Sequence, residues 1–220
     1  LAINKFMTQQ AFAGSFDAPS LIRTVPRILT HGLTNVNILD LAPEDNTVPR
    51  FANFVDFIPR FSTSCAQLIE GVSKDEDPSH TVAWTIIGSP LATVAMPLVL
   101  LPNDKLPETV GRGTTGGSAL CRYGLKLKER LFPLRTKTRS SYIDVAQLVN
   151  RKGNGILQLI RPIEDELMDK GTALVNDLRN EKEGNEKDDN KKEGNKKDVY
   201  KAFADYYSWA DGVIKEQYEK

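Results

Sequence analysis

The chain has 220 residues, enough to bury a substantial hydrophobic core in one domain. Its composition, 40% hydrophobic and 26% charged, is that of an ordinary globular protein. Lys plus Arg and Asp plus Glu number 29 each, which argues against a general electrostatic attraction to nucleic acid or anionic lipid.

The two cysteines, Cys65 and Cys121, form no C-x-x-C motif and have no histidine at zinc spacing. We therefore expect no structural metal site, and buried free thiols are favoured over one disulfide. The chain begins with Leu1 rather than Met, which predicts a processed or truncated chain, or one cut from a longer protein.

The first third predicts little regular structure. Leu1–Phe6 alternates apolar and polar residues like a short strand. Ala18–Gly32 has apolar residues at helical spacing, Asp17 as an N-cap and Gly32 as a stop, while Pro26 should kink or break this helix. Residues 34–59 read as irregular.

The uncharged run Thr81–Pro102 is long enough to span a bilayer, but its composition favours two buried strands. Gly88-Ser89-Pro90 is typical of a turn, and it separates Thr81–Ile87 from Leu91–Leu101, both rich in strand-forming residues. We expect a β-hairpin here and no membrane span, preceded by a strand over Ser62–Val72.

The second half predicts helices. Their ranges are Ser118–Phe132, Tyr142–Arg151, Gly155–Arg179 and Val199–Tyr218. Pro162 should be absorbed as a kink or a break, and the aromatic face of the last helix should pack in the core. Asn180–Asp198 contains only Asn, Glu, Lys, Gly and Asp, which predicts a solvated loop or helix extension.

Residues 103–117 form a Pro- and Gly-rich loop whose end, Gly111–Gly117, lacks the ending and context of a phosphate-binding loop, so a flexible loop is favoured. Cys65 with His80, oriented by Asp75 or Asp77, would make a thiol–imidazole pair. An apolar strand around Cys65 instead favours a buried, inert thiol, and the polar loop around His80 favours a solvated ring.

Two further groups of titratable residues favour structural roles. His31 precedes the predicted helix stop, where an imidazolium would meet the negative end of the helix dipole. The carboxylates Glu164, Asp165, Glu166 and Asp169 lie on one predicted helix, so we expect a solvated face rather than a catalytic pair.

Several segments in order resemble a known family. They are Pro59–Val72 (PRFSTSCAQLIEGV), Glu76–Pro78, Thr81–Leu98, a Leu-rich helix ending in Arg130–Pro133, the turn Asn150–Gly155 and the Tyr- and Trp-rich final helix. Together they resemble the C-terminal half of the linear-amide C–N hydrolases, relatives of penicillin V acylase, bile salt (choloylglycine) hydrolase and acyl-CoA:6-aminopenicillanate acyltransferase, and in particular their exported branch. The resemblance spans residues 1–220, with 180–198 as an insertion.

This resemblance implies an α+β protein with the four-layer αββα sandwich of N-terminal nucleophile hydrolases, of which residues 1–220 would be one C-terminal part. It implies cleavage of a small acylated amine at a linear amide bond, without a cofactor, and an exported or periplasmic location. The nucleophile in that family is an N-terminal Cys freed by processing, so it would lie upstream or on a cleaved partner chain.

Two site residues follow from the resemblance alone. Asn4 matches an active-site Asn that donates to an oxyanion, and Arg60, in Arg60-Phe61, matches an Arg that holds the charges of the site. The alternatives are a strand-capping Asn4 and a surface Arg60. For the whole chain, the alternative is a non-catalytic α/β binding or scaffold domain that keeps the fold and has lost the chemistry.

Overall fold

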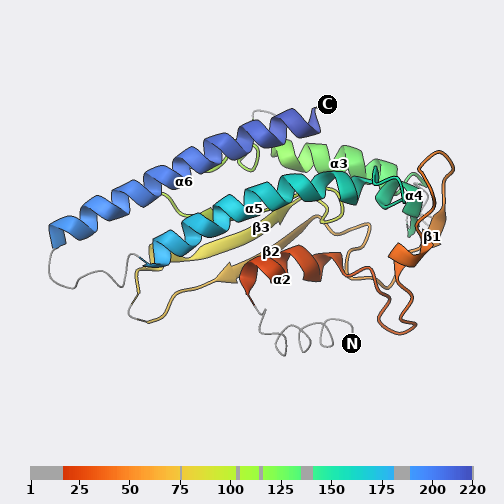
Figure 1. The fold of residues 1–220 in the computed structure, drawn as a ribbon, viewed down its shortest axis with the longest axis horizontal. Helices are drawn as coiled ribbons and strands as arrows, with labels where there is room; N and C mark the ends of the chain where they lie inside the picture. The colour runs from red at the N-terminus through yellow and green to blue at the C-terminus, as the bar shows by residue number, and fades with distance from the viewer. Residues whose placement is uncertain are drawn as a thin grey trace.

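The computed structural model describes residues 17–74, 76–102, 105–113, 116–134, 141–180 and 189–219, and within 189–198 it describes the backbone alone. The described part is an α+β fold, with helices packed on small antiparallel sheets (Figure 1). The fold class predicted from the sequence is confirmed at this level.

The larger sheet has three antiparallel strands in the order β2 (Cys65–Glu70), β3 (Val82–Ile87) and β4 (Ala95–Val99). The predicted hairpin is confirmed, because β3 and β4 pair through Trp84↔Pro97. Gly88 follows β3 with φ 101°, a left-handed conformation that glycine adopts without strain. None of the helices in the described ranges has the length and hydropathy needed to cross a membrane.

The helices are α2 (Ala18–Thr24), α3 (Ala119–Leu131), α4 (Val145–Leu148), α5 (Ile156–Asn180) and α6 (Asp189–Tyr218), with short 3-10 turns η1 (Val25–Arg27), η2 (Ile38–Leu41) and η3 (Pro78–His80). Asp17 caps α2 as predicted, because its Oδ1 accepts a hydrogen bond from the Ser20 amide at 2.8 Å. The predicted extension of this helix to Gly32 is wrong, since the chain narrows to η1 around Pro26 and leaves helical geometry at Ile28.

The predicted helix over Tyr142–Arg151 is wrong at both ends, because only α4 (Val145–Leu148) is helical and the chain is extended again at Val149. Residues Tyr142–Asp144 form β5, which pairs with β1 (Phe51–Asn53) through Ala52↔Ile143. Asp144 then caps the short α4 by accepting from the Ala146 amide. The strand partner lies far away in the sequence, and local periodicity does not report it.

Two long helices, α5 and α6, run side by side above the larger sheet (Figure 1). α5 contains Pro162 near its start and continues without a break. It approaches β4 closely at Gly171, where an added Cβ would lie 2.4 Å from Pro97 Cγ. α6 begins before the predicted Val199, and residues 181–188 of the low-complexity segment lie outside the described residues.

Buried side chains form two hydrophobic clusters. The first contains Trp84, Met96, Leu167, Phe203 and Tyr207, so the prediction that the aromatic face of α6 packs in the core is confirmed. The second gathers around Phe54, Phe132, Ile143 and Leu148, near the β1–β5 pair. A polar network and a pocket lie beside these clusters, between α2 and α5.

The two edges of the larger sheet differ. At β4 the outward amides of Ala95 and Val99 donate to Glu164 Oε2 (2.7 Å) and Tyr207 Oη (2.8 Å), and Pro97 between them has no N–H. At β2 the pair formed by the Gly88 amide and the Ser64 carbonyl sets the alternation, which points the amides of Cys65, Gln67 and Ile69 outward. Within the described part of the chain, the β4 edge is therefore closed to a further strand, whereas the β2 edge is open, because its outward amides pair with no strand.

Candidate functional site

A buried ion pair joins the N-terminal segment to α5. Arg27 and Glu164 have side chains only 9% and 4% exposed, and the guanidinium binds both carboxylate oxygens at 2.6 and 2.5 Å. The remaining Arg27 donors reach the carbonyls of Arg23, Pro90 and Thr93. Every N–H of this guanidinium therefore has an acceptor, as a buried charge requires.

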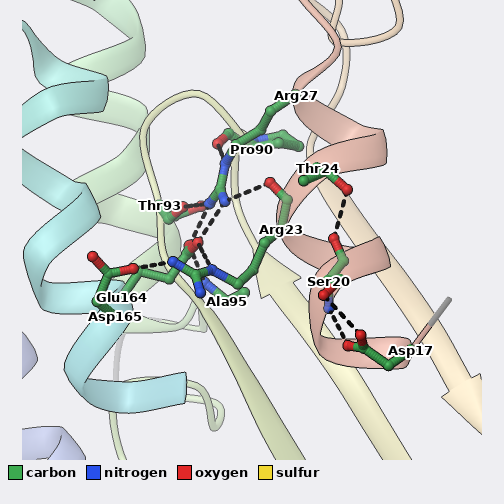
Figure 2. A network of polar contacts seen from close by, with 10 residues as sticks. All are labelled: Asp17, Ser20, Arg23, Thr24, Arg27, Pro90, Thr93, Ala95, Glu164 and Asp165. Atoms are coloured by element: carbon green, nitrogen blue, oxygen red, sulfur yellow. Dashed lines mark hydrogen bonds and ion pairs between the residues drawn. The ribbon is translucent and has the colours of Figure 1, made fainter. Parts of the chain in front are cut away.

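Arg23 extends the same network toward solvent. It lies one turn before Arg27, donates to Glu164 Oε1 at 3.3 Å, and forms an ion pair with Asp165. Figure 2 shows both arginines reaching from α2 and η1 toward the two acids on α5, with the strands behind them. The expectation that Glu164 belongs to a solvated face is wrong, because its carboxylate is buried against Arg23, Arg27 and the Ala95 amide.

A pocket of about 860 Å³ lies beside this network. It is formed by the end of α2 and η1, the segment 28–42, the α4–α5 connection and the first turns of α5. Its lining combines four arginines (Arg23, Arg27, Arg151 and Arg161) with apolar side chains that include Ile28, Leu39, Val149 and Leu157. A smaller hollow of about 400 Å³ lies at Glu70, Ser73, Glu76 and Arg179.

The hydrogen bonds of the wall fix the shape of this pocket. Gln158 accepts from the amides of Asn150 and Gly155 and donates to the Asn150 carbonyl at 2.9 Å. Asn150, itself 2% exposed, donates from Nδ2 to the Ala146 carbonyl at 3.0 Å. These bonds hold the α4–α5 turn, which carries Arg151, in one conformation.

His31 also lines the pocket, and its position corrects a prediction. It lies in a turn after η1 rather than at a helix C-terminus, where Nδ1 accepts from the Thr34 amide at 3.1 Å. An amide can only donate, so the neutral ring carries its proton on Nε2. His31 therefore offers the pocket region a donor rather than an acceptor.

The two site residues inferred from the resemblance are not brought together in the described structure. Asn4 lies outside the described residues. Arg60 is exposed in a turn closed by bonds between its backbone and Thr63, and it is not among the residues that line the pocket. Their proposed roles stay predictions.

The cysteines are free, as expected, but both are exposed, so the prediction of buried thiols is wrong. Cys65 lies on the open edge strand β2 and Cys121 on α3. His80, predicted to be solvated, is buried at 7% exposure inside η3, and Asp75 lies outside the described residues. In the ranges that the structure covers, no group of three or more His, Cys, Asp or Glu residues is placed to hold a metal ion.

The residues that make the network were missed from the sequence alone. Glu164 and Arg27 are 137 positions apart, so no local pattern pairs them. One signal was present: Arg23 and Arg27 are four positions apart within a predicted helix, which places them on one face. Comparisons with protein-family models, with curated proteins and with solved structures find no match to this chain.

Proposed function

We propose that the chain is the C-terminal segment of an amidase-type N-terminal nucleophile hydrolase that cleaves the linear amide bond of a small acylated amine. The nucleophilic Cys would come from an upstream segment or a cleaved partner chain. Two observations support this proposal: the resemblance of several segments, in order, to the family, and a sheet whose β2 edge has no partner strand in the described ranges and whose second face is exposed beside that edge. The second is the structural observation that carries it.

The alternation of the strands defines the two sides of the sheet. Leu68, Trp84 and Pro97 share one face, and Gly171 of α5 packs on Pro97. On the opposite face Thr85 and Met96 are buried, but toward β2 the face opens, and Ile69 is 61% exposed.

In a four-layer αββα sandwich, a second sheet packs on that opposite face, and further strands extend the edge. The open face and the open β2 edge of this chain lie where these partners would be needed. A chain that supplied one helix layer and part of one sheet would leave such surfaces uncovered.

The proposed chemistry places a free α-amine and its own Cys thiol at the start of the nucleophile segment. The amine, with a pKa of about 8, takes the thiol proton, and the thiolate attacks the amide carbonyl. The C–N bond breaks as the leaving amine takes that proton, and water then hydrolyses the thioester. Asn4 would donate to the oxyanion and Arg60 would hold the charges of the site.

The test compares the 220-residue chain with the longer translation product of its gene, using N-acylated amines whose free amine is detected after release. We expect no hydrolysis by the chain alone and hydrolysis by the longer product. Replacement of the first Cys of the mature upstream segment by Ser should abolish activity. Hydrolysis by the pure 220-residue chain would contradict the proposal.

A second candidate, a non-catalytic binding domain, is favoured by a separate observation. The arginine-lined pocket has the volume of a small-molecule site, and neither Cys65 nor Cys121 lines it. An upstream sequence without a Cys exposed by processing would support this candidate over the hydrolase.

A further inference from the structure

The four arginines of the pocket are not equivalent, because two of them already have counterions. Arg27 is paired with buried Glu164, and Arg23 with Asp165. Arg151 has only a distant partner, since its Nη1 lies 4.0 Å from Glu44 and both side chains are exposed. Arg161 makes no hydrogen bond or ion pair to any residue of the described ranges.

The charge that remains at the pocket is therefore positive and lies on one wall. Arg151 and Arg161 both come from the α4–α5 connection and the start of α5. A guanidinium binds carboxylates through two parallel N–H donors, so this wall favours an anionic group with that geometry.

The rest of the lining mixes apolar side chains with polar ones, among them Asn37, Gln158 and Asp165, which is paired with Arg23. Ile28, Leu39, Val149 and Leu157 line the pocket, and Leu39 is 45% exposed although its side chain is hydrophobic. The volume of about 860 Å³ falls within the usual range for small-molecule sites. A ligand that fills this space needs an apolar body besides its charged group.

The wall that carries the free arginines is rigid before any ligand arrives. The bonds between Asn150 and Gln158 fix the turn before α5, and the buried Arg27–Glu164 pair anchors η1 to α5 beside the pocket. Binding would therefore order the two exposed arginine side chains but not the turn that carries Arg151.

We propose that this pocket binds an amphipathic organic monocarboxylate, with the carboxylate at Arg161 and Arg151 and the apolar body against Ile28, Leu39 and Leu157. The inference goes beyond the proposed hydrolase function and does not depend on it. Binding requires no nucleophile and no upstream segment, so the two proposals fail or succeed separately.

The first experiment uses two probes that share one apolar body, N-octanoylglycine and its neutral amide N-octanoylglycinamide, in titration calorimetry with the purified protein. We expect the carboxylate to bind about 10-fold more tightly, since its two oxygens can accept charge-assisted hydrogen bonds from two arginines without a close counterion. Added salt should lower the affinity for the carboxylate probe and leave the affinity for the amide probe unchanged. Equal affinities, or no binding of the carboxylate, would overturn the proposal.

The second experiment assigns the site. Arg161→Gln should lower the affinity for N-octanoylglycine about 10-fold and leave the affinity for N-octanoylglycinamide unchanged. Arg112→Gln, which removes the same charge from an exposed residue outside the pocket lining, should change neither probe. Leu39→Ala should lower the affinity for both probes by the same factor, because both have the same apolar body.

Arg161 is exposed and unbonded within the described ranges, so its replacement should leave the melting temperature unchanged, and this is measured on every variant. Arg151→Gln tests the other arginine in the same way. It should also lower the affinity for the carboxylate probe and leave the affinity for the amide probe unchanged. Equal effects of Arg161→Gln and Arg112→Gln would show that binding does not involve this pocket and would overturn the assignment.

Discussion

Glu164 is the residue whose environment departs most from the expectation for a helical carboxylate. Its two oxygens accept from Arg27, Arg23 and the Ala95 amide, so one side chain joins α2, α5 and β4. A buried charge of this kind is tolerated because each partner neutralises or hydrogen-bonds the other. Removing one member leaves the remaining charge in a medium that solvates it poorly.

Glu164→Gln should therefore destabilise the protein by about 3–5 kcal/mol, because Arg27 stays buried without a counterion. The matched control is Asp165→Asn, because the Asp165 side chain is 48% exposed. We expect this variant to lose at most about 1 kcal/mol of unfolding free energy. Urea unfolding measures both free energies. Similar values for the two variants would contradict the central role of Glu164.

Gly171 gives a second residue-scale prediction, because its missing side chain permits the contact between α5 and β4. An alanine Cβ would lie 2.4 Å from Pro97 Cγ and 2.9 Å from Tyr206 Oη, and Pro97 cannot rotate away. We expect Gly171→Ala to cost about 1–3 kcal/mol through overpacking.

The matched control for this change is Gly212, another glycine inside a helix, which would have nothing within 4 Å of the added Cβ. Gly212→Ala should stabilise by about 0.5–1 kcal/mol through helix propensity. Thermal and urea unfolding of both variants give the comparison. If Gly171→Ala stabilised the protein as Gly212→Ala should, the close contact between α5 and β4 would not constrain position 171, which would contradict the prediction.

At the scale of elements, the hydroxyl of Tyr207 connects α6 to the edge of β4. It accepts from the Val99 amide at 2.8 Å and lies 3.2 Å from the Val99 carbonyl. Tyr207→Phe keeps the ring in the core and leaves that buried amide without a partner. We expect a loss of about 1–3 kcal/mol and faster hydrogen exchange at the Val99 amide.

Tyr142→Phe serves as the control for Tyr207→Phe, since Tyr142 is 38% exposed and lies on β5. Its stability and the exchange of the Val99 amide should match those of the unmodified protein. Unchanged exchange of the Val99 amide in Tyr207→Phe would show that this amide does not depend on the Tyr207 hydroxyl as its hydrogen-bond acceptor.

At the scale of the whole molecule, α6 carries two buried tyrosines, Tyr206 and Tyr207, and a half-buried one, Tyr218. Burial raises the pKa of Tyr207 to about 12 and also raises the pKa of Tyr206 and of Tyr218. The unfolded chain loses these protons near pH 10, whereas the folded chain keeps them, so it binds more protons between about pH 10 and about pH 12. Folding stability should therefore fall as the pH rises through this window.

The measurement for this alkaline effect is the free energy of urea unfolding at several values between about pH 9 and about pH 11. In Tyr207→Phe the decline with pH should be shallower, because one of the retained protons is gone. A stability that stays constant across the window would show that the phenols ionise in the folded protein.

The elements that could be predicted were those with local signals. The β3–β4 hairpin follows from Gly88-Ser89-Pro90 between strand-forming residues, and α3 from its periodicity and Ser118 cap. β5 could not be predicted, because its reason for being a strand is β1, far away in the chain.

The candidate site was less predictable than the fold, because it depends on which surfaces become covered. Glu164 is buried against Arg27 of η1 and Arg23 of α2, which no pattern within α5 reports. Cys65 has the alternation of a half-buried strand, and whether its face is covered depends on a partner that local sequence does not name. Asn4 and Arg60 rested on resemblance alone.

The unequal edges of the larger sheet have a consequence for self-association. Pro97, Glu164 and Tyr207 occupy the donor positions of β4, so another strand cannot pair there, while β2 presents its amides to solvent. Two copies that met through β2 would form one continuous sheet with a blocked β4 at each end. Growth of this sheet by strand pairing would stop at that dimer, because β4 offers no free backbone donor to a third copy.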